Sequence, residues 1–360
     1  MSVETTPAVS LAGMESNSAG LGGIPHRLRQ VRRDFLLALE PVRPSVYRYC
    51  RSLAGNVWDA EDLLQDTLAK ALAEASQRHE PIRNPQAWLI RIATSTWLDT
   101  VRRSNRSTTA DFSTPEMDRP DHGAADPLTA VAVEAALRRL VLLLPPRERV
   151  CVVLKDVFGY SLAETADVLE TSAGAVKSAL HRGRSTLAAA QEPSSRADSP
   201  ADGSARSSAG TPAGSSAAGA PAGHADLLRR LADAFNSYDI ESMVSLFLAN
   251  GRTEVVGNVS ETGHEEIRTG SLDHTFGPDA PEIYRATVHA FDGEEVILLW
   301  ERPKDSPHAA DVVADVVRMR AADGVPLIAE TKVYYFCPEL LAEVAGGLGL
   351  PFKTNGVSYF

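Results

Sequence analysis

The sequence predicts a multi-domain protein in which two all-α units are followed by a C-terminal α+β unit. Apolar residues recur at helical spacing through most of residues 24–190. In residues 224–360, two helical segments precede stretches in which apolar and polar residues alternate, the pattern of half-buried strands. Between these parts, Ala, Ser, Gly and Pro make up 26 of the 31 residues at 193–223. Such a composition predicts a flexible linker with a root-mean-square span of roughly 30 Å.

Charge is unevenly distributed along the 360-residue chain, whose net charge is −11. Residues 24–110 carry 14 basic and 9 acidic side chains, whereas residues 224–360 carry 11 and 22. Phosphate contacts supply most of the non-specific affinity for DNA, so this weak basicity argues against tight binding to DNA alone. A mildly basic front half is instead typical of a protein that recognises DNA together with a large partner.

Cysteine spacing and hydropathy argue against a cysteine-bound metal site, a membrane span and a secretory signal. Cys50, Cys151 and Cys337 are far apart and lack metal-like spacing, which predicts buried thiols in a reducing compartment. No apolar run approaches ~18 residues, and no secretory signal precedes the first helix. We therefore expect a cytoplasmic protein with no membrane span, metal or cofactor, and a disordered leader over residues 1–23.

The first helical unit is predicted to present an acidic helix face. Residues 27–53 are expected to be helical with a bend at Pro41 and Pro44. A second helix is expected to begin at Asp59 and to bury Ala60, Leu63, Leu64, Leu68, Ala71 and Leu72. The opposite side carries Glu61, Asp62, Gln65 and Asp66 and is predicted to be exposed. It is either a solvated face or a docking surface for a basic partner.

A third long helix is predicted from Asn84, as its cap, to Arg106. Its polar face carries Arg91, Ser95, Arg102 and Arg106, and Arg103 adds to the charge at the C-terminal end. These cations either complement the helix dipole or contact nucleic acid. Thr94, Ser95, Thr96 and Trp97 are predicted to be exposed, where Trp97 could stack on a base.

Residues 161–187 have the pattern of a helix-turn-helix. Ser161 and Glu164 can form a capping box for the first helix, and Thr171 or Ser172 can cap the second. The second helix has an apolar side formed by Val176, Leu180, Gly183 and Leu187. Its front carries Lys177, His181 and Arg184 beside the small residues Ser178 and Ala179, which suits a DNA groove. The alternative is a helical hairpin whose polar face is solvated.

Four motifs in order resemble the extracytoplasmic-function (ECF) group of sigma factors in the sigma-70 family. They are AEDLLQDTL (60–68), NPQAWLIRIAT…LDTVRR (84–103), LPPRERVCVVLKDVFGYSLAETADVL (144–169) and GAVKSALHRGR (174–184). The resemblance implies an alternative sigma factor, not an enzyme, that binds core RNA polymerase and directs promoter-specific initiation. It divides the front half into region 2 at 24–106, an acidic linker at 107–126 that threads the polymerase, and region 4 at 127–190.

The resemblance also implies site residues. Contacts with core polymerase, through the clamp helices of its β′ subunit and through β, are implied for Asp62, Leu63, Gln65 and Asp66. Contacts with the −10 element are implied for Arg78, Arg83, Asn84, Arg91, Ser95, Trp97, Arg102, Arg103 and Arg106. Contacts with the −35 element are implied for Ser172, Ala175, Lys177, Ser178, His181, Arg182 and Arg184. Thr94, Ser95 and Ala179 depart from residues common in the family, which affects the promoter sequence expected rather than the activity.

After the 191–223 linker, residues 224–360 resemble a SnoaL-like (NTF2-like) domain, which some ECF sigma factors carry at this position. The resemblance implies a cone with a curved, mainly antiparallel sheet. Strands are expected at 252–257, 284–291, 294–302, 311–320 and 327–336, followed by a helix at 338–349. The implied role is modulation of sigma activity, through an intramolecular contact or a small ligand.

Two alternatives to this reading remain open. The cone could be a small-molecule sensor or an enzyme, and its candidate acid–base residues are Tyr238, His264, His274, His289, Tyr334 and Tyr335. The whole chain could instead be a stand-alone helix-turn-helix regulator, which would leave the motifs at 60–68 and 84–106 unexplained.

Overall fold

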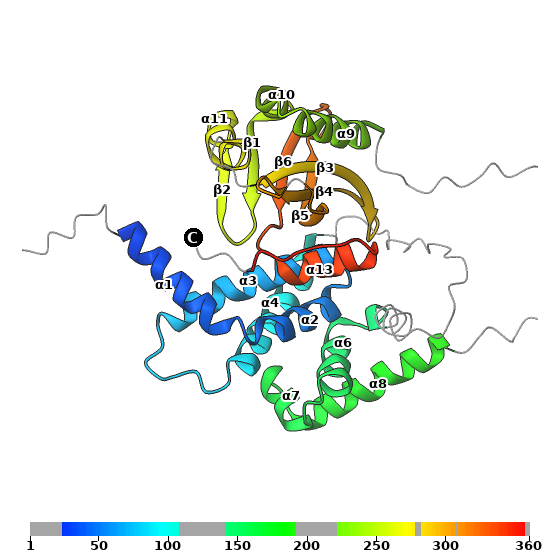
Figure 1. The fold of residues 1–360 in the computed structure, drawn as a ribbon. Helices are drawn as coiled ribbons and strands as arrows, with labels where there is room; N and C mark the ends of the chain where they lie inside the picture. Colours follow the sequence, from blue (N-terminus) through cyan, green and yellow to red (C-terminus); the bar gives the residue numbers. More distant parts are fainter. Residues whose placement is uncertain (1–23, 108–140, 192–221, 278–281, 307, 357–360) are drawn as a thin grey trace, which may run out of the picture.

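The computed structural model describes residues 24–107, 141–191, 222–277, 282–306 and 308–356 (Figure 1). The leader at 1–23 therefore lies outside the described residues, as does nearly all of the two linkers expected at 107–126 and 191–223.

The N-terminal helical unit comprises α1 (Ile24–Leu39), α2 (Arg43–Ala54), α3 (Val57–Ala75) and α4 (Pro85–Ser107). The predicted break near Pro41 and Pro44 separates α1 from α2, and the predicted cap of α4 is confirmed, because the Ala87 amide donates to Asn84 Oδ1 at 3.0 Å. α3 begins two residues before the predicted start. The reason is that Asn56 caps it, accepting a hydrogen bond from the Asp59 amide at 2.7 Å.

The second helical unit contains α6 (Pro146–Val152), a π-helical turn η3 (Val153–Val157), α7 (Leu162–Val168) and α8 (Ala173–Gln191). The predicted capping box is confirmed: the Glu164 amide donates to Ser161 Oγ, and the Ser161 amide donates to Glu164 Oε2. These hydrogen bonds lower the pKa of the Glu164 carboxyl. α7 and α8 pack on α6 through a small apolar core of Leu144, Cys151, Val152, Ala166, Val176, Ala179 and Leu180.

The C-terminal domain begins with α9 (Ala222–Asn236) and α10 (Ile240–Ser245) and ends with α13 (Pro338–Gly347). Its strands are β1 (Phe247–Val255), β2 (Val259–Thr262), β3 (Glu282–Phe291), β4 (Glu294–Pro303), β5 (Val312–Ala321) and β6 (Ile328–Val333). They form one sheet in the order β2-β1-β6-β5-β4-β3, in which only the β1–β6 pair is parallel. The predicted mainly antiparallel sheet is confirmed. The sequence pattern missed β2 and the short helical segments α11 (His264–Ile267), η4 (Arg268–Leu272) and α12 (Asp273–Phe276).

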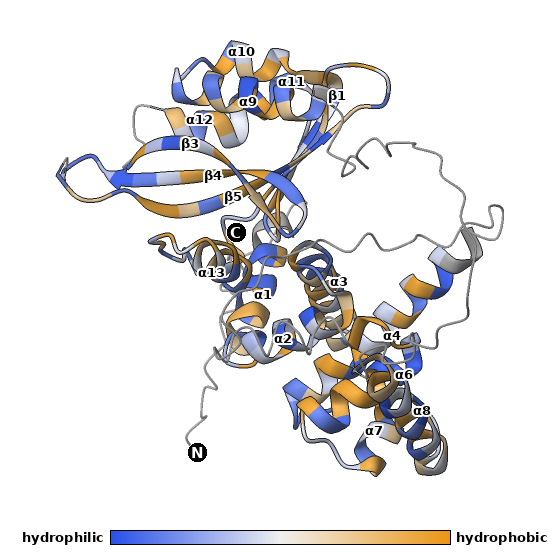
Figure 2. Cartoon of the chain, turned by 90° about the vertical axis from the view of Figure 1, so that its right-hand side faces the viewer, coloured by the Kyte–Doolittle hydropathy of each residue, from blue (hydrophilic) through white to orange (hydrophobic). Residues whose placement is uncertain are grey.

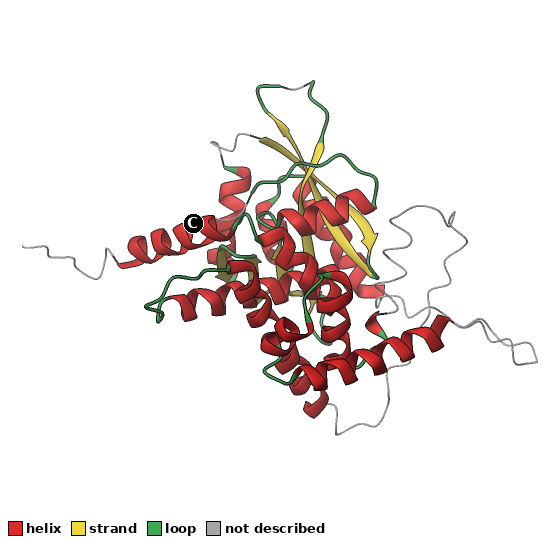
Figure 3. Cartoon of the chain, turned by 90° about the horizontal axis from the view of Figure 1, so that it is seen from below, coloured by secondary structure: helices red, strands yellow, loops and turns green. Residues whose placement is uncertain are grey.

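The two faces of the curved sheet have different partners. α9 and α10 cover one face, and α13 lies on the other face, between the sheet and the N-terminal helices (Figures 1 and 2). Seen from below, helices lie in front of the strands (Figure 3). One apolar cluster runs from α2, α3 and α4 through α13 to the sheet, and it includes Trp58, Val296, Leu298, Tyr334 and Leu341. Burial of apolar surface therefore holds the C-terminal domain against the N-terminal helical unit.

Candidate polymerase and promoter interfaces

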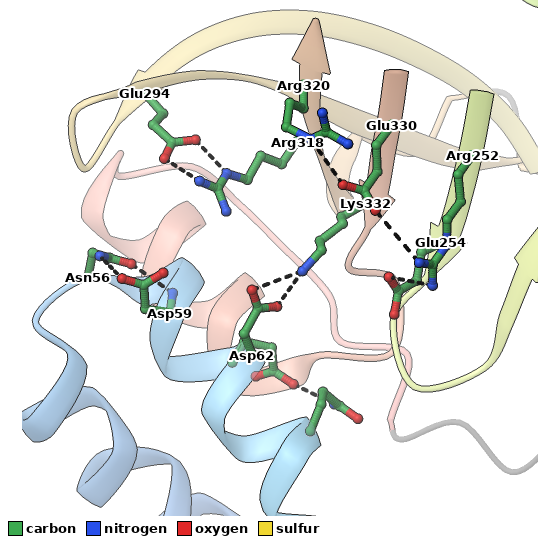
Figure 4. Close-up of polar contacts among 12 residues, drawn as sticks. Asn56, Asp59, Asp62, Arg252, Glu254, Glu294, Arg318, Arg320, Glu330 and Lys332 are labelled. Carbon is green, nitrogen blue, oxygen red and sulfur yellow. Dashed lines mark hydrogen bonds and ion pairs between the residues drawn. The ribbon is translucent and has the colours of Figure 1, made fainter. Parts of the chain in front are cut away.

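The predicted polymerase-binding residues lie near the start of α3, where the C-terminal domain also makes contact. Both carboxylate oxygens of Asp62 accept hydrogen bonds from Lys332 Nζ of β6, at 2.7 and 2.9 Å (Figure 4). Leu63 is buried in the apolar cluster. Gln65 is half-buried, whereas Asp66 is exposed and has no ion pair within the described part of the chain.

The prediction that Glu61 is exposed is wrong. Glu61 is fully buried, where its Oε1 accepts from Arg43 Nη2 at 3.1 Å and from Gln65 Nε2 at 2.7 Å. The position faces α2 and the docked C-terminal domain rather than water. Of the four residues predicted for this face, the acids that remain at the surface are therefore Asp62 and Asp66.

Helix α13 binds α2 through charged and polar side chains. Arg43 contacts Glu339 as well as Glu61 and is itself buried. One turn further along α13, Glu343 accepts from Arg51 Nε at 2.8 Å and from the Tyr47 hydroxyl at 3.1 Å. Because these groups are largely removed from water, their loss would leave uncompensated buried charge.

The start of α3 is held by a second set of contacts from the sheet side. The Val57 amide donates to Asp292 Oδ2 at 3.0 Å, in the turn between β3 and β4. Trp58 packs on Tyr334 with ring centroids 5.6 Å apart, and the Arg318 guanidinium lies 5.5 Å from the centre of the Trp58 ring. Arg318 in turn binds both oxygens of Glu294 (Figure 4). The C-terminal domain thus contacts both the N-terminus of α3 and, through Lys332 and Asp62, its acidic side.

Several predicted −10 residues surround one hollow. A space of about 530 Å³ lies between the α3–α4 loop and the second helical unit. Arg78, Arg83, Asn84 and Arg91 line one side, and Glu164 and Asp167 of α7 line the other. In this arrangement α7 lies opposite the surface predicted to bind the −10 element, so the opposing charges face each other across the hollow.

The prediction that Trp97 is exposed for base stacking is wrong. Its side chain is buried, and the Arg149 guanidinium of α6 lies 5.2 Å from the ring centre. Thr94 and Thr96 are also buried, contrary to expectation, and Thr94 Oγ1 lies 2.6 Å from the Tyr49 hydroxyl. Ser95, Arg102 and Arg103 are exposed, and Arg102 pairs with Asp99. The side chain of Arg106 lies outside the described residues.

The predicted recognition helix α8 presents most of its expected front to solvent. Ala175, Lys177, Ser178 and His181 are exposed, whereas Ser172 Oγ accepts from the Ala175 amide at 3.2 Å and caps the helix. Ala179 is buried against the small core, so its placement on the front is wrong. Arg182 and Arg184 are exposed but paired, with Glu148 and Asp156 respectively. Of the predicted −35 residues, Lys177 and His181 are therefore exposed and have no ion pair within the described part of the chain.

The six candidate acid–base residues of the C-terminal domain do not converge. Tyr238 is exposed and donates to the Tyr284 carbonyl at 3.1 Å, and His264 Nε2 lies 3.0 Å from the Phe247 carbonyl. His274 is exposed, whereas His289 contacts Thr287 and has its pKa lowered by burial. Tyr334 is buried against Trp58, at the docking surface and not on the α9 side of the sheet.

Sequence reasoning missed two buried carboxyls in the C-terminal domain. Burial raises the pKa of both Glu301 on β4 and Asp315 on β5. Lys353, near the C-terminus, forms an ion pair with Glu301. Burial, with the nearby charges of Glu301 and Asp315, raises the pKa of Tyr335 to about 12. The described residues contain no group of three or more His, Cys, Asp or Glu side chains arranged for a metal ion.

The three cysteine thiols are buried, as the sequence predicts. Cys50, Cys151 and Cys337 are buried and unpaired, and burial raises the pKa of Cys151 to about 11. Among the described helices, none combines the length and the apolar character needed to span a membrane.

Two sigma-70 family models match the front half of the chain: Sigma-70 region 2 at residues 39–107 and Sigma-70, region 4 at residues 134–187. These matches fall on the two helical units that carry the interfaces described above. The helix-turn-helix and the acidic α3 thus belong to a sigma-70 architecture.

Relatives of similar sequence are sigma-70 family members of the ECF group. The ECF RNA polymerase sigma factor SigM of Mycobacterium tuberculosis is 37% identical over 146 residues, which cover 40% of this chain and 69% of SigM. SigG of the same organism is 31% identical over 251 residues, and the match spans only 62% of the length of either protein. The chain belongs to the ECF group of sigma factors. Among solved structures, SigJ of M. tuberculosis aligns over 83% of this chain and 95% of SigJ, with 17% identity and a TM-score of 0.31.

Proposed function

We propose that this chain is an alternative sigma factor that binds core RNA polymerase and directs initiation at its own promoters. The observation that carries the proposal is the succession of region 2 and region 4, with acidic Asp62 and Asp66 on α3 and the exposed cation Lys177 on α8. Region 2 would contact the β′ clamp helices and the −10 element, and α8 would contact the −35 element. A stand-alone helix-turn-helix regulator would have no use for an acidic docking helix.

The C-terminal domain is proposed to modulate this activity. Lys332 forms an ion pair with the carboxylate of Asp62. In addition, α13 binds α2, and the sheet side of the domain binds the start of α3. A polymerase subunit that needs Asp62 must displace the domain or bind after it has moved. The described arrangement is therefore the closed form of the factor. No catalytic step is assigned to the domain, since its candidate side chains are scattered.

Run-off transcription with core polymerase tests the proposal. The full chain and core polymerase are expected to give discrete transcripts from a subset of genomic fragments, whereas neither gives them alone. Binding to specific DNA fragments in the absence of core polymerase, with no factor-dependent transcript in its presence, would instead support the stand-alone regulator.

Substitution of α8 cations should weaken −35 recognition without affecting the polymerase contact. Lys177→Ala and Arg184→Ala are each expected to reduce transcription from a −35-dependent promoter. Loss of one phosphate contact should lower the slope of log affinity against log salt by ~1. The effect of Arg184→Ala should be smaller, because Arg184 also pairs with Asp156. Normal transcription by both variants would show that another face of α8 meets the DNA, and co-purification with core polymerase serves as the control.

A further inference from the structure

A cavity of about 210 Å³ lies where α1 and α3 meet the C-terminal domain. Phe35 of α1 and Leu68 and Leu72 of α3 line one side. Val256, which follows β1, and Phe336, which follows β6, line the other. Since both parts of the chain contribute walls, the cavity is complete only while the C-terminal domain is docked on region 2.

The charged side chains that line this cavity are both basic. They are the guanidinium groups of Arg32 and Arg43, and no carboxylate is among the lining residues. The third polar side chain of the lining is Gln65, whose Nε2 already donates to Glu61. Arg43 is neutralised by Glu61 and Glu339, whereas Arg32 contacts the Gly257 carbonyl and has no carboxylate partner among the described residues. The cavity therefore combines apolar walls with one uncompensated cation, which favours an anionic group attached to an apolar body.

The turn at Gly257 brings the two parts of the chain close together. Gly257 has φ +77°, and a Cβ at this position would lie 3.2 Å from Gln65 Oε1. The Arg32 contact with its carbonyl ties α1 to the same turn. Arg32 thus stands at the junction, where a bound anion would contact α1 and the turn after β1 together.

We propose that this cavity binds a small apolar monocarboxylate, with its carboxylate on Arg32 and its hydrocarbon part between Phe35, Leu68 and Phe336. The cavity volume of about 210 Å³ suits a ligand no larger than a short or medium acyl chain. A ligand that binds only the docked form stabilises that form. The acid would therefore act together with the docked domain to inhibit polymerase binding. This inhibition rests on the proposed function, whereas the binding of the acid to the cavity does not.

Binding is tested on the full chain, without polymerase, by titration calorimetry and thermal shift. Hexanoate and octanoate are the probes, and octanol and octylammonium are controls of matched length. Both acids should bind and raise the unfolding temperature, and Arg32→Met should weaken them by about tenfold or more through loss of a charge-assisted hydrogen bond. Arg29→Met, at an exposed position one turn away on α1, should leave binding unchanged.

A cavity-filling pair of variants separates this site from general hydrophobic binding. Ala69→Phe places a ring in the cavity and should abolish octanoate binding, whereas Ala73→Phe, exposed one turn later on α3 and outside the cavity, should not. Octanol binding as tight as octanoate binding would contradict the proposed site, as would undiminished octanoate binding to the Ala69→Phe chain.

The regulatory consequence has its own readout. Octanoate at saturation should lower the affinity of the full chain for core polymerase, and Arg32→Met should remove this effect. Octanoate binding with an unchanged polymerase affinity would overturn the regulatory role. A chain that fails to bind core polymerase even without octanoate would instead contradict the proposed function and leave the ligand site standing.

Discussion

A chain that carries Asp62→Arg together with Asp66→Arg is expected to lose co-purification with core RNA polymerase. The two carboxylates lie about one turn apart on the side of α3 that is predicted to meet a basic partner, and both are at least partly exposed. Reversal of their charge places like charges against each other, which costs several kcal/mol where the contact is desolvated. The fold should persist, because neither side chain contributes to the apolar cluster.

Controls for this double substitution come from the chain itself. Asp226→Arg with Asp233→Arg makes the same change in net charge on exposed positions of α9, on the far side of the sheet from region 2 (Figure 1). Lys332→Ala removes the partner of Asp62 without altering α3 and should preserve or strengthen polymerase binding. Undiminished co-purification of the Asp62→Arg/Asp66→Arg chain, with an unchanged circular dichroism spectrum, would move the polymerase contact away from α3.

The helices of the front half could be predicted closely from the sequence because their signals are local. Asn84 and Ser161 cap helices through hydrogen bonds that span three residues. Short-range features of this kind need no knowledge of the rest of the fold.

The exposure of individual positions could not be predicted where a distant segment covers them. Trp97 is covered by the main apolar cluster and by the Arg149 guanidinium from the second unit, which the pattern of its own helix does not reveal. The burial of Glu61 has a similar cause. The helical period places Glu61 beside Asp62 on the acidic face, but Arg43 and the docked α13 cover it. Periodicity gives the face of a helix but not the partner that will cover it.

The interdomain surface had no signal in the sequence. Glu339 and Glu343 are spaced by four residues on α13 and, taken alone, are indistinguishable from a solvated acidic stripe. Lys332 is one polar residue on a strand, and its partner Asp62 lies 270 positions earlier. Only the fold reveals that the acidic C-terminal domain uses its carboxylates to bind Arg43 and Arg51 and its lysine to bind the acidic helix.

Asp62 therefore has two competing partners in the proposed mechanism. Lys332 belongs to the same chain, so its docking is intramolecular and is favoured by a high effective concentration. Core polymerase must overcome this advantage through a larger interface. A substitution that weakens docking of the C-terminal domain at a distance from Asp62 should therefore favour polymerase binding. The contacts of α13 with α2 are a suitable place for such a substitution.

Glu339→Arg together with Glu343→Arg is expected to raise polymerase binding and basal transcription. The substitutions place cations against Arg43 and Arg51, two buried arginines of α2. Breaking a buried ion pair costs about 3–5 kcal/mol, which would shift the ratio of docked to undocked chains by roughly two orders of magnitude or more. Asp62 and Asp66 remain in place, so the freed α3 can still bind the polymerase.

Titration of core polymerase with each variant, followed by run-off transcription at equal factor concentration, measures this effect. The chain with Asp226→Arg and Asp233→Arg should behave like the wild type, which excludes a general effect of charge. Combining Glu339→Arg/Glu343→Arg with Asp62→Arg/Asp66→Arg should abolish the gain, because undocking helps only when the acidic side of α3 is intact. Lower transcription from a folded Glu339→Arg/Glu343→Arg chain would reverse the assignment: the docked domain would then hold region 2 in its active arrangement, and Lys332 would orient Asp62 instead of competing for it.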